Sequence, residues 1–267
     1  MLIDILSFSC PLILCSFGAL FSEYAGCLAL FLEGLVSFSA FLNFAFSVWT
    51  GNLFLGGLLS VFSSVIMIFA FAWLIERFGA HKFIAGTAIN LLLVSLTSCF
   101  SFVFFGSRGV LTSPSYHYDL LATKIFTIVF SAIMVGAAIL FLMKSRQGLY
   151  LRITGSDSDV LLAKGVNPSF SRVLSWVLAA LYASLAGLFL TMRISSFVPN
   201  ISSGRGWMAL AAIFLGKKKP LRMVFAVIIF CATDYFGIHI QNIFPAIPTS
   251  VLLSLPYTVA LLLTVLK

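Results

Sequence analysis

Long apolar runs, separated by short polar breaks, fill almost the whole of this 267-residue chain. A helix needs about 20 consecutive apolar residues to cross the hydrocarbon core of a bilayer. Runs of that length recur from one end of the sequence to the other, and charged residues make up only 9% of the chain. A water-soluble domain carries more charge than this on its surface. The sequence therefore predicts an all-α, polytopic helical membrane protein.

The apolar runs predict about eight long transmembrane helices and one short half-helix, in a single transmembrane domain formed by residues 1–267. The run at 206–216 is too short to cross a bilayer in full, which is why it is expected to form the half-helix. A transmembrane β-barrel would show alternating segments of about 10 residues, and this pattern is not seen. The long spans are expected at residues 2–20, 27–49, 53–75, 83–105, 124–143, 173–192, 223–243 and 247–266.

Basic residues gather in the breaks between the runs, and their placement predicts the orientation. Lys and Arg beside membrane spans are retained on the cytoplasmic side. Clusters at 77–82, 144–172 and 217–222, together with Lys267, fall on one side if the N-terminus is outside. We therefore assign the net charge of +8 to topology and to anionic membrane lipids, and not to nucleic acid. The basic residues on the opposite side are Arg108, Lys124, Arg193 and Arg205.

The long hydrophilic segment at 144–172 is expected to be a cytoplasmic loop with a short helix in its middle. It holds five of the sixteen basic residues. Ser156 or Asp157 can cap this helix, and Asp157 and Asp159 suit the positive end of its dipole. Gly165 then ends the helix. The apolar face expected to lie against a partner comprises Val160, Leu161 and Ala163.

Enzyme, cofactor and metal motifs are not visible in the sequence. The five cysteines lie inside apolar runs without metal-type spacing, so we interpret them as small buried hydrophobic residues. No P-loop is present, and neither are the HExxH and GxSxG patterns. We expect a chain that is not an enzyme, binds no cofactor or metal, and does not itself bind ATP through a P-loop.

Polar residues inside the apolar runs are candidates for a solute pathway, because they are costly in a membrane. Glu33 is the clearest candidate, since Gly34 beside it permits a helix break or a close neighbour. The alternative is that Glu33 lies near the cytoplasmic interface, where it is solvated or paired. Thr87 and Asn90 share roughly one helix face, and they would line a pathway or join helices.

The half-helix at 206–216 is a second candidate for contact with a solute. If its N-terminus points at the pathway, it offers free N–H groups and a partial positive charge to a polar ligand. Arg205 stands at that end, and Trp207 could stack on a planar ring. The alternative role for Trp207 is that of an anchor at the membrane interface.

Four segments together resemble a known family. The stretch LFSEYAGCLALFLEGL at 20–35 is similar to a signature LFSERSGVVNIGLEG, although the Asn of that signature is lost here. GRGWMALAAIFLG at 204–216 is similar to GRGFIALAALIFG, and GTAINLLL at 86–93 and the loop at 155–167 add weaker matches. These segments resemble the permease subunits of bacterial ABC importers of the branched-chain amino acid/monosaccharide type. The closest branch serves simple sugars, nucleosides and riboflavin.

The resemblance implies a working unit in the bacterial cytoplasmic (inner) membrane that contains more than this chain. A second permease subunit, either a copy or a paralogue, would complete the pathway. Two ABC ATPase subunits would bind ATP in the cytoplasm, and an extracytoplasmic binding protein would deliver the solute. The residues expected to couple this chain to the ATPase are Asp157, Asp159, Leu161, Leu162, Lys164 and Gly165.

The solute is expected to be small, polar and ring-containing, of the nucleoside or riboflavin type, with a monosaccharide as the alternative. Its pathway would be lined by Glu33, Thr87, Asn90, Arg205 and Trp207. An ion-coupled secondary carrier is a competing class. It would need a titratable pair near the midplane, for which only Glu33 and Asp234 are available. An adjacent reading frame that encodes an ATPase with a P-loop would distinguish the two classes.

Overall fold

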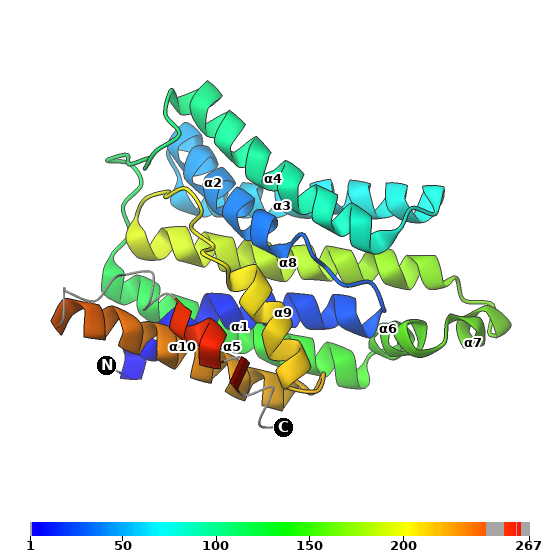
Figure 1. Ribbon diagram of the computed structural model, residues 1–267. Helices are drawn as coiled ribbons and strands as arrows, with labels where there is room; N and C mark the ends of the chain where they lie inside the picture. Colours follow the sequence, from blue (N-terminus) through cyan, green and yellow to red (C-terminus); the bar gives the residue numbers. More distant parts are fainter. Residues whose placement is uncertain (1, 244–253, 260, 263–267) are drawn as a thin grey trace.

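The computed structural model describes residues 2–243, 254–259 and 261–262, and it confirms the all-α class (Figure 1). Within the described residues, seven helices are long and apolar enough to cross a membrane. An isolated antiparallel bridge joins Leu111 to Phe197. The helices are α1 (Leu2–Tyr24), α2 (Leu32–Thr50), α3 (Leu53–Phe78), α4 (Lys82–Phe105), α5 (Leu120–Lys144), α6 (Arg146–Ser156), α7 (Ser158–Ala163), α8 (Pro168–Ile194), α9 (Arg205–Leu215) and α10 (Pro220–Ile243).

Seven of the predicted long spans and the predicted half-helix have counterparts in the structure. The seven long helices are α1 to α5, α8 and α10, and α9 is the half-helix. The predicted start of α2 was wrong by five residues, because residues 25–31 form a loop. This loop leads back along the bundle from the end of α1 to the start of α2 (Figure 1). The predicted span at 247–266 lies mostly outside the described residues.

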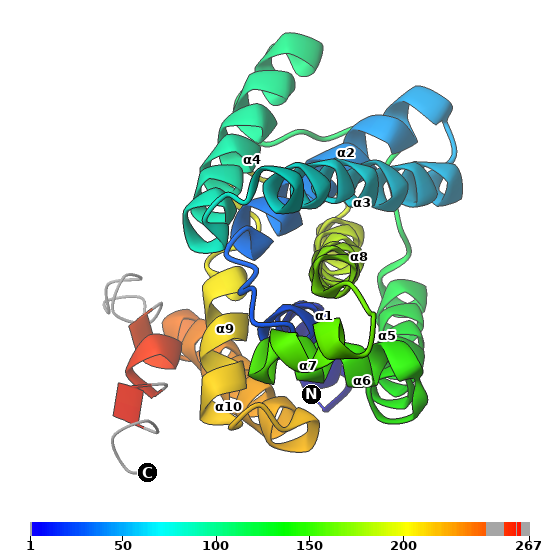
Figure 2. The same cartoon turned by 90° about the vertical axis from the view of Figure 1, so that its right-hand side faces the viewer.

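The centre of the bundle is formed by α1 and α8, which pack along each other. Gly18 of α1 allows this approach, since a Cβ there would lie 2.9 Å from the carbonyl oxygen of Ala179. Figure 2, viewed along the bundle, shows α8 between α1 and the α2–α3 layer. α4 and α9 lie on one flank, with the start of α2 between them (Figures 1 and 2). In contrast to α1, α2 and α8, helices α3, α4 and α5 leave most of their surface exposed, as expected for faces that contact lipid.

Polar side chains fix where several helices begin. Each of these side chains accepts at least one N–H group from the first turn, which would otherwise have no partner. Glycines in the left-handed conformation, at 51, 79 and 106, end α2, α3 and α4. The capping residues are Asn52, Asp119, Ser145, Asp157 and Asn167.

The basic clusters at 77–82, 144–172 and 217–222 lie at one end of the bundle. The α3–α4 turn, α6 with α7, and the α9–α10 turn are all found there, while the N-terminus lies at the opposite end (Figure 1). We call the end with the basic clusters the cytoplasmic end, on the basis of the positive-inside rule. Lys267 lies outside the described residues.

The predicted loop at 144–172 is more structured than the sequence indicated, because α6 precedes the short helix. Small and apolar residues of α6 recur on one face, and they pack on α5, α1 and α8. Gly155 leaves no room for a Cβ against the carbonyl oxygen of Tyr24, at the end of α1. The interpretation of this segment as one helix in a hydrophilic loop was therefore wrong. Its first half is part of the packed protein.

Candidate functional site

The first turn of α9 is held by the carboxylate of Glu33, which reaches it from the first turn of α2. The backbone N–H groups of Gly204 and Gly206 each donate to this carboxylate at 2.7 Å, one to Oε1 and the other to Oε2. The hydroxyl of Ser202 also donates to Oε1. A carboxylate is favoured here because the N-terminus of a helix carries a partial positive charge. We call Glu33, Ser202, Gly204 and Gly206 the Glu33 clamp.

The two helices meet backbone to backbone at the Glu33 clamp. A Cβ on Gly206 would lie 2.5 Å from the backbone N and 2.7 Å from the Cα of Glu33. One turn further along α2, the hydroxyl of Ser37 donates to the hydroxyl of Ser202 at 2.9 Å. Glu33 and Ser37 are both buried, so this chain of hydrogen bonds is shielded from solvent. Buried polar groups that are satisfied in this way hold neighbouring elements in a defined position.

Asn90 of α4 performs a similar task for the start of α2. Its side-chain Oδ1 accepts the N–H of Gly34 at 2.6 Å. The N-cap residue of α2, Phe31, makes no capping side-chain hydrogen bond, so Asn90 supplies an acceptor from a neighbouring helix. Asn90 and Glu33 together connect α4 to α2 and α2 to α9. This geometry supports the interpretation of Asn90 as a residue that joins helices.

The expectation that the start of α9 offers free N–H groups to a solute was wrong at Gly204 and Gly206. Both groups are already used by Glu33. A carboxylate placed 171 residues earlier in the chain satisfies the helix end before any ligand arrives. Of the two readings of Glu33, the one in which this residue is paired agrees with the geometry.

The side chains of the other sequence-predicted pathway residues, Thr87, Arg205 and Trp207, make no hydrogen bond to the Glu33 carboxylate in the described structure. The hydroxyl of Thr87 donates to carbonyl oxygens of its own helix, at Phe83 and Ile84. Arg205 donates to the carbonyl oxygens of Ile201 and Ser202, and its guanidinium lies 5.3 Å from the centre of the Phe8 ring. Trp207 keeps 45% of its surface exposed on α9.

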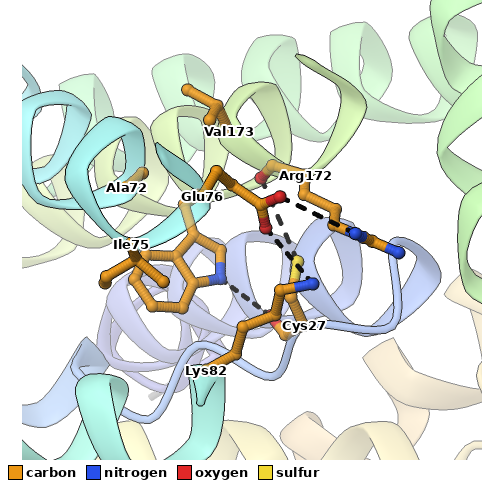
Figure 3. A pocket seen from close by; sticks show the side chains of 8 residues that line it. Cys27, Ala72, Ile75, Glu76, Lys82, Arg172 and Val173 are labelled. Atoms are coloured by element: carbon orange, nitrogen blue, oxygen red, sulfur yellow. Dashed lines mark hydrogen bonds and ion pairs between the residues drawn. The ribbon is translucent and has the colours of Figure 1, made fainter. Parts of the chain in front are cut away.

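A half-buried ion-pair cluster at the cytoplasmic end was not predicted. Glu76 of α3 pairs with Lys82 of α4 at 3.2 Å and with Arg172 of α8 at 3.6 Å. Figure 3 shows these side chains converging beside Cys27, whose carbonyl oxygen accepts the indole N–H of Trp176 at 2.9 Å. A groove of about 690 Å³ opens next to the cluster. The sequence signal was the motif ERFGAHK at 76–82, of which we interpreted only the basic cluster at 77–82, as an indication of the orientation.

The α1–α2 loop is anchored at the same place. The Cys27 thiol is buried and lies 3.1 Å from the hydroxyl of Ser175 in α8. Burial raises the pKa of the Cys27 thiol to about 11, because the thiolate is poorly solvated there. This agrees with the interpretation of Cys27 as a small buried hydrophobic residue.

Helix α7 presents a different face from the predicted one. Asp157 caps the helix by accepting the N–H of Asp159 at 3.0 Å, and Gly165 ends the segment with a φ of 72°. Leu161, which we expected on the partner-facing side, is completely buried in the protein, whereas Leu162 is 58% exposed. The predicted apolar face was therefore wrong at Leu161. The exposed surface of the segment includes Asp159, Val160, Leu162, Ala163, Lys164 and Gly165.

Comparisons with known proteins agree with this architecture. A permease protein for guanosine from Bacillus subtilis, NupQ, is 25% identical over 96% of this chain and 88% of its own length. A nucleoside permease protein from Lactococcus lactis, NupC, is 26% identical over 98% of this chain and 90% of its own. A putative glucose permease protein from Haloferax volcanii, TsgC13, is 28% identical over 87% and 75%. Each of the three is named as part of an ABC transporter.

A solved structure shares the fold. PsaBC from Streptococcus pneumoniae, in complex with Fab, superposes with a TM-score of 0.57 at 15% sequence identity, covering 97% of this chain and 90% of that one. A family model described as "Branched-chain amino acid transport system / permease component" matches residues 1–266. The match and the seven apolar helices make this a multi-pass protein of the cytoplasmic membrane. The chain belongs to the family of permease components of branched-chain amino acid transport systems.

Proposed function

We propose that this chain is the permease subunit of an ATP-driven importer for a small, polar, ring-containing solute of the nucleoside type. The observation that carries the proposal is the alignment of nearly the whole chain with permease proteins named for guanosine and for nucleosides. The relative named for glucose makes a monosaccharide the alternative. Riboflavin is a further ring-containing candidate, supported by the resemblance of residues 20–35 and 204–216 to the branch that serves it.

In this proposal the chain forms the pathway, and other subunits supply energy and solute. ATP binds to a separate ABC ATPase, and this chain holds no cofactor. The ATPase docks on the exposed face of α7, formed by residues such as Leu162 and Lys164. A second permease subunit, a copy or a paralogue, completes the pathway, and an extracytoplasmic binding protein delivers the solute.

The contacts described above support a route by which movement at α7 reaches the Glu33 clamp. Helix α6 touches the end of α1 through Gly155 and Tyr24. The following loop leads directly to Glu33, which holds α9. Because both carboxylate oxygens of Glu33 are occupied by α9, Glu33 is better suited to transmitting a movement than to carrying an ion. This favours an ATP-driven importer over an ion-coupled carrier.

Trp207 is the residue that we assign to ring recognition, with Arg205 and Thr87 as further polar groups of the pathway. Trp207 belongs to α9, and nearly half of its surface is exposed. Stacking of a nucleobase on an aromatic side chain contributes about 1–3 kcal/mol. A pathway residue must bind its cargo weakly enough to release it, and a single exposed indole meets this requirement.

The test is uptake by the complete reconstituted importer, measured with guanosine, riboflavin and glucose. We expect guanosine uptake by the unaltered protein and at least a fivefold decrease in Trp207→Ala, the lower bound for stacking. Trp73→Ala is the matched control, because Trp73 is 46% exposed but lies on α3 beside Arg77. Uptake of glucose alone would overturn the nucleoside assignment. Equal guanosine uptake by Trp207→Ala and Trp73→Ala would overturn the role of Trp207.

A further inference from the structure

A cavity lined by both polar and apolar side chains lies in the outer half of the protein. It has a volume of about 240 Å³ and opens between α2, α4 and the connector that precedes α9. We call it the outer cleft. Its polar lining consists of Ser37, Thr97, Ser98, Ser101, Arg108 and Asn200. Within a span as apolar as α4, such a gathering of hydroxyl groups is costly unless the groups have partners.

The hydroxyl protons of the buried lining residues are directed away from the cleft. Thr97 donates to the carbonyl oxygen of Leu93 at 2.7 Å, and Ser101 donates to that of Ser107 at 2.7 Å. Ser37 donates to Ser202 in the Glu33 clamp. A hydroxyl that donates once still has oxygen lone pairs with which to accept. These three hydroxyl groups therefore keep the capacity to accept a hydrogen bond from a ligand.

Donors stand at the rim of the same cavity. Arg108 belongs to the loop after α4, with its guanidinium 5.2 Å from the centre of the Phe102 ring, and Asn200 is exposed on the connector. The guanidinium and the side-chain amide both donate hydrogen bonds. Acceptors inside and donors at the rim match a neutral ligand whose groups both donate and accept. Alcohol groups do both, whereas the positive charge of Arg108 disfavours a cation.

The volume of the outer cleft and its apolar lining residues restrict further which ligands fit. Pockets for drug-sized molecules have volumes of about 300–1,000 Å³, so a cavity of 240 Å³ suits one small ring better than a base and a sugar together. Val94, Phe197 and Pro199 supply apolar surface that can cover the C–H face of such a ring. The bridge between Leu111 and Phe197 holds this wall in place.

We propose that the outer cleft is a binding site for the hydroxyl-bearing sugar ring of the solute. This inference rests on the proposed function and adds the part of the solute that the permease recognises on the outer side. Ser37 lines the cleft and also donates a hydrogen bond to Ser202, which in turn donates to Glu33. A ring bound in the cleft therefore contacts Ser37, which is hydrogen-bonded to the Glu33 clamp that holds α9.

The test compares guanosine with 2′,3′-dideoxyguanosine, which lacks two ring hydroxyls, in uptake by the complete importer. The discrimination is the ratio of the uptake rate of guanosine to that of the dideoxy compound. It is measured for the unaltered protein and for Thr97→Val, a substitution that removes a hydrogen-bond acceptor with little change in shape. We expect Thr97→Val to reduce the discrimination about fivefold, as for the loss of one hydrogen bond. The same binding protein delivers both compounds, so its own preference cancels when the variant is compared with the unaltered protein.

Two further variants keep the test decisive. Thr127→Val is the matched control, because Thr127 is a buried threonine of α5 that donates to its own helix and lies outside the cleft. Ser98→Ala changes an exposed lining residue that cannot affect folding strongly, and it should also reduce the discrimination. If guanosine is carried and the discrimination is unchanged in Thr97→Val and Ser98→Ala, the cleft assignment is overturned alone. If the unaltered protein carries no guanosine, the proposed function is overturned and the cleft assignment with it.

Discussion

Gly206 is a residue at which the structure leaves no room for a side chain. A Cβ there would collide with the backbone of Glu33, and backbone atoms cannot move aside as the end of a flexible side chain can. Gly136 of α5 is also a helical glycine, but nothing lies within 4 Å of the position that its Cβ would occupy. The two glycines therefore separate the effect of a close contact from the general preference of a helix for alanine.

We predict that Gly206→Ala lowers the free energy of unfolding by about 1–3 kcal/mol, as overpacking does elsewhere. Gly136→Ala should leave it unchanged or raise it by up to about 1 kcal/mol, because alanine favours a helix. Both variants are measured by thermal unfolding of the purified protein in detergent. Equal stability of the two variants would contradict the backbone contact between α2 and α9.

At the scale of single residues, Glu33 could be predicted from the sequence as a candidate, but its partners could not. An acidic residue in an apolar run must be paired or solvated, because an unpaired charge is costly in a membrane. This requirement can be inferred from the residue and its apolar sequence neighbours alone. Ser202 and Gly204 lie about 170 residues later, and only the packing of α2 on α9 brings them together. Asn90 was a candidate for the same reason, and its partner Gly34 was equally hidden.

Helix α7 shows how two adjacent leucines take different roles in one element. A helix turns by about 100° per residue, so Leu161 and Leu162 cannot face the same way. Leu161 is completely buried, and Leu162 is 58% exposed. In the proposed importer, only Leu162 is available to an ATPase.

We predict that Leu162→Glu uncouples ATP hydrolysis from uptake while the protein still folds. Leu161→Glu places an unpaired charge in the core, which costs several kcal/mol, so this variant should fail to accumulate in the membrane. Yield after purification and the ratio of ATP hydrolysed to solute transported distinguish the two outcomes. Normal coupling in Leu162→Glu would instead direct attention to the turns at 76–82 and 217–222.

The positions of helices were predicted well where the length of an apolar run determines them. They were predicted poorly where packing against other helices determines them. The centres of the seven long helices follow from runs of about 20 apolar residues. The start of α2 does not, because residues 27–31 are as apolar as the helix that follows. α6 was missed for the opposite reason: its mean polarity indicates a loop, and only Gly148, Leu151 and Thr154 on one face permit it to pack.

At the scale of the whole molecule, the distribution of charge divides the protein into two ends. The basic clusters at 77–82, 144–172 and 217–222 gather at one of them. Two exposed positions report on the two ends, namely Asp159 in α7 and Ser115 in the loop between α4 and α5. Four of the five native cysteines are buried, and Cys99 is exposed.

We predict that Asp159→Cys and Ser115→Cys, each in a Cys99→Ser background, react with a membrane-impermeant thiol reagent from opposite sides. Ser115→Cys should be labelled in intact cells, and Asp159→Cys only after the membrane is opened, because the basic end is cytoplasmic. The Cys99→Ser protein without an added cysteine supplies the background. Labelling of both positions in intact cells would contradict the orientation.

Helix α9 is fastened at its far end as well as at the Glu33 clamp. In the α9–α10 turn, Lys218 pairs with Glu23 at 2.6 Å, and its carbonyl oxygen accepts the hydroxyl of Tyr24 at 2.5 Å. Because both ends of α9 are held, the helix cannot rotate about one end relative to α1 and α2. We therefore expect α9 to move together with α1 and α2, and not independently of them, when the pathway opens.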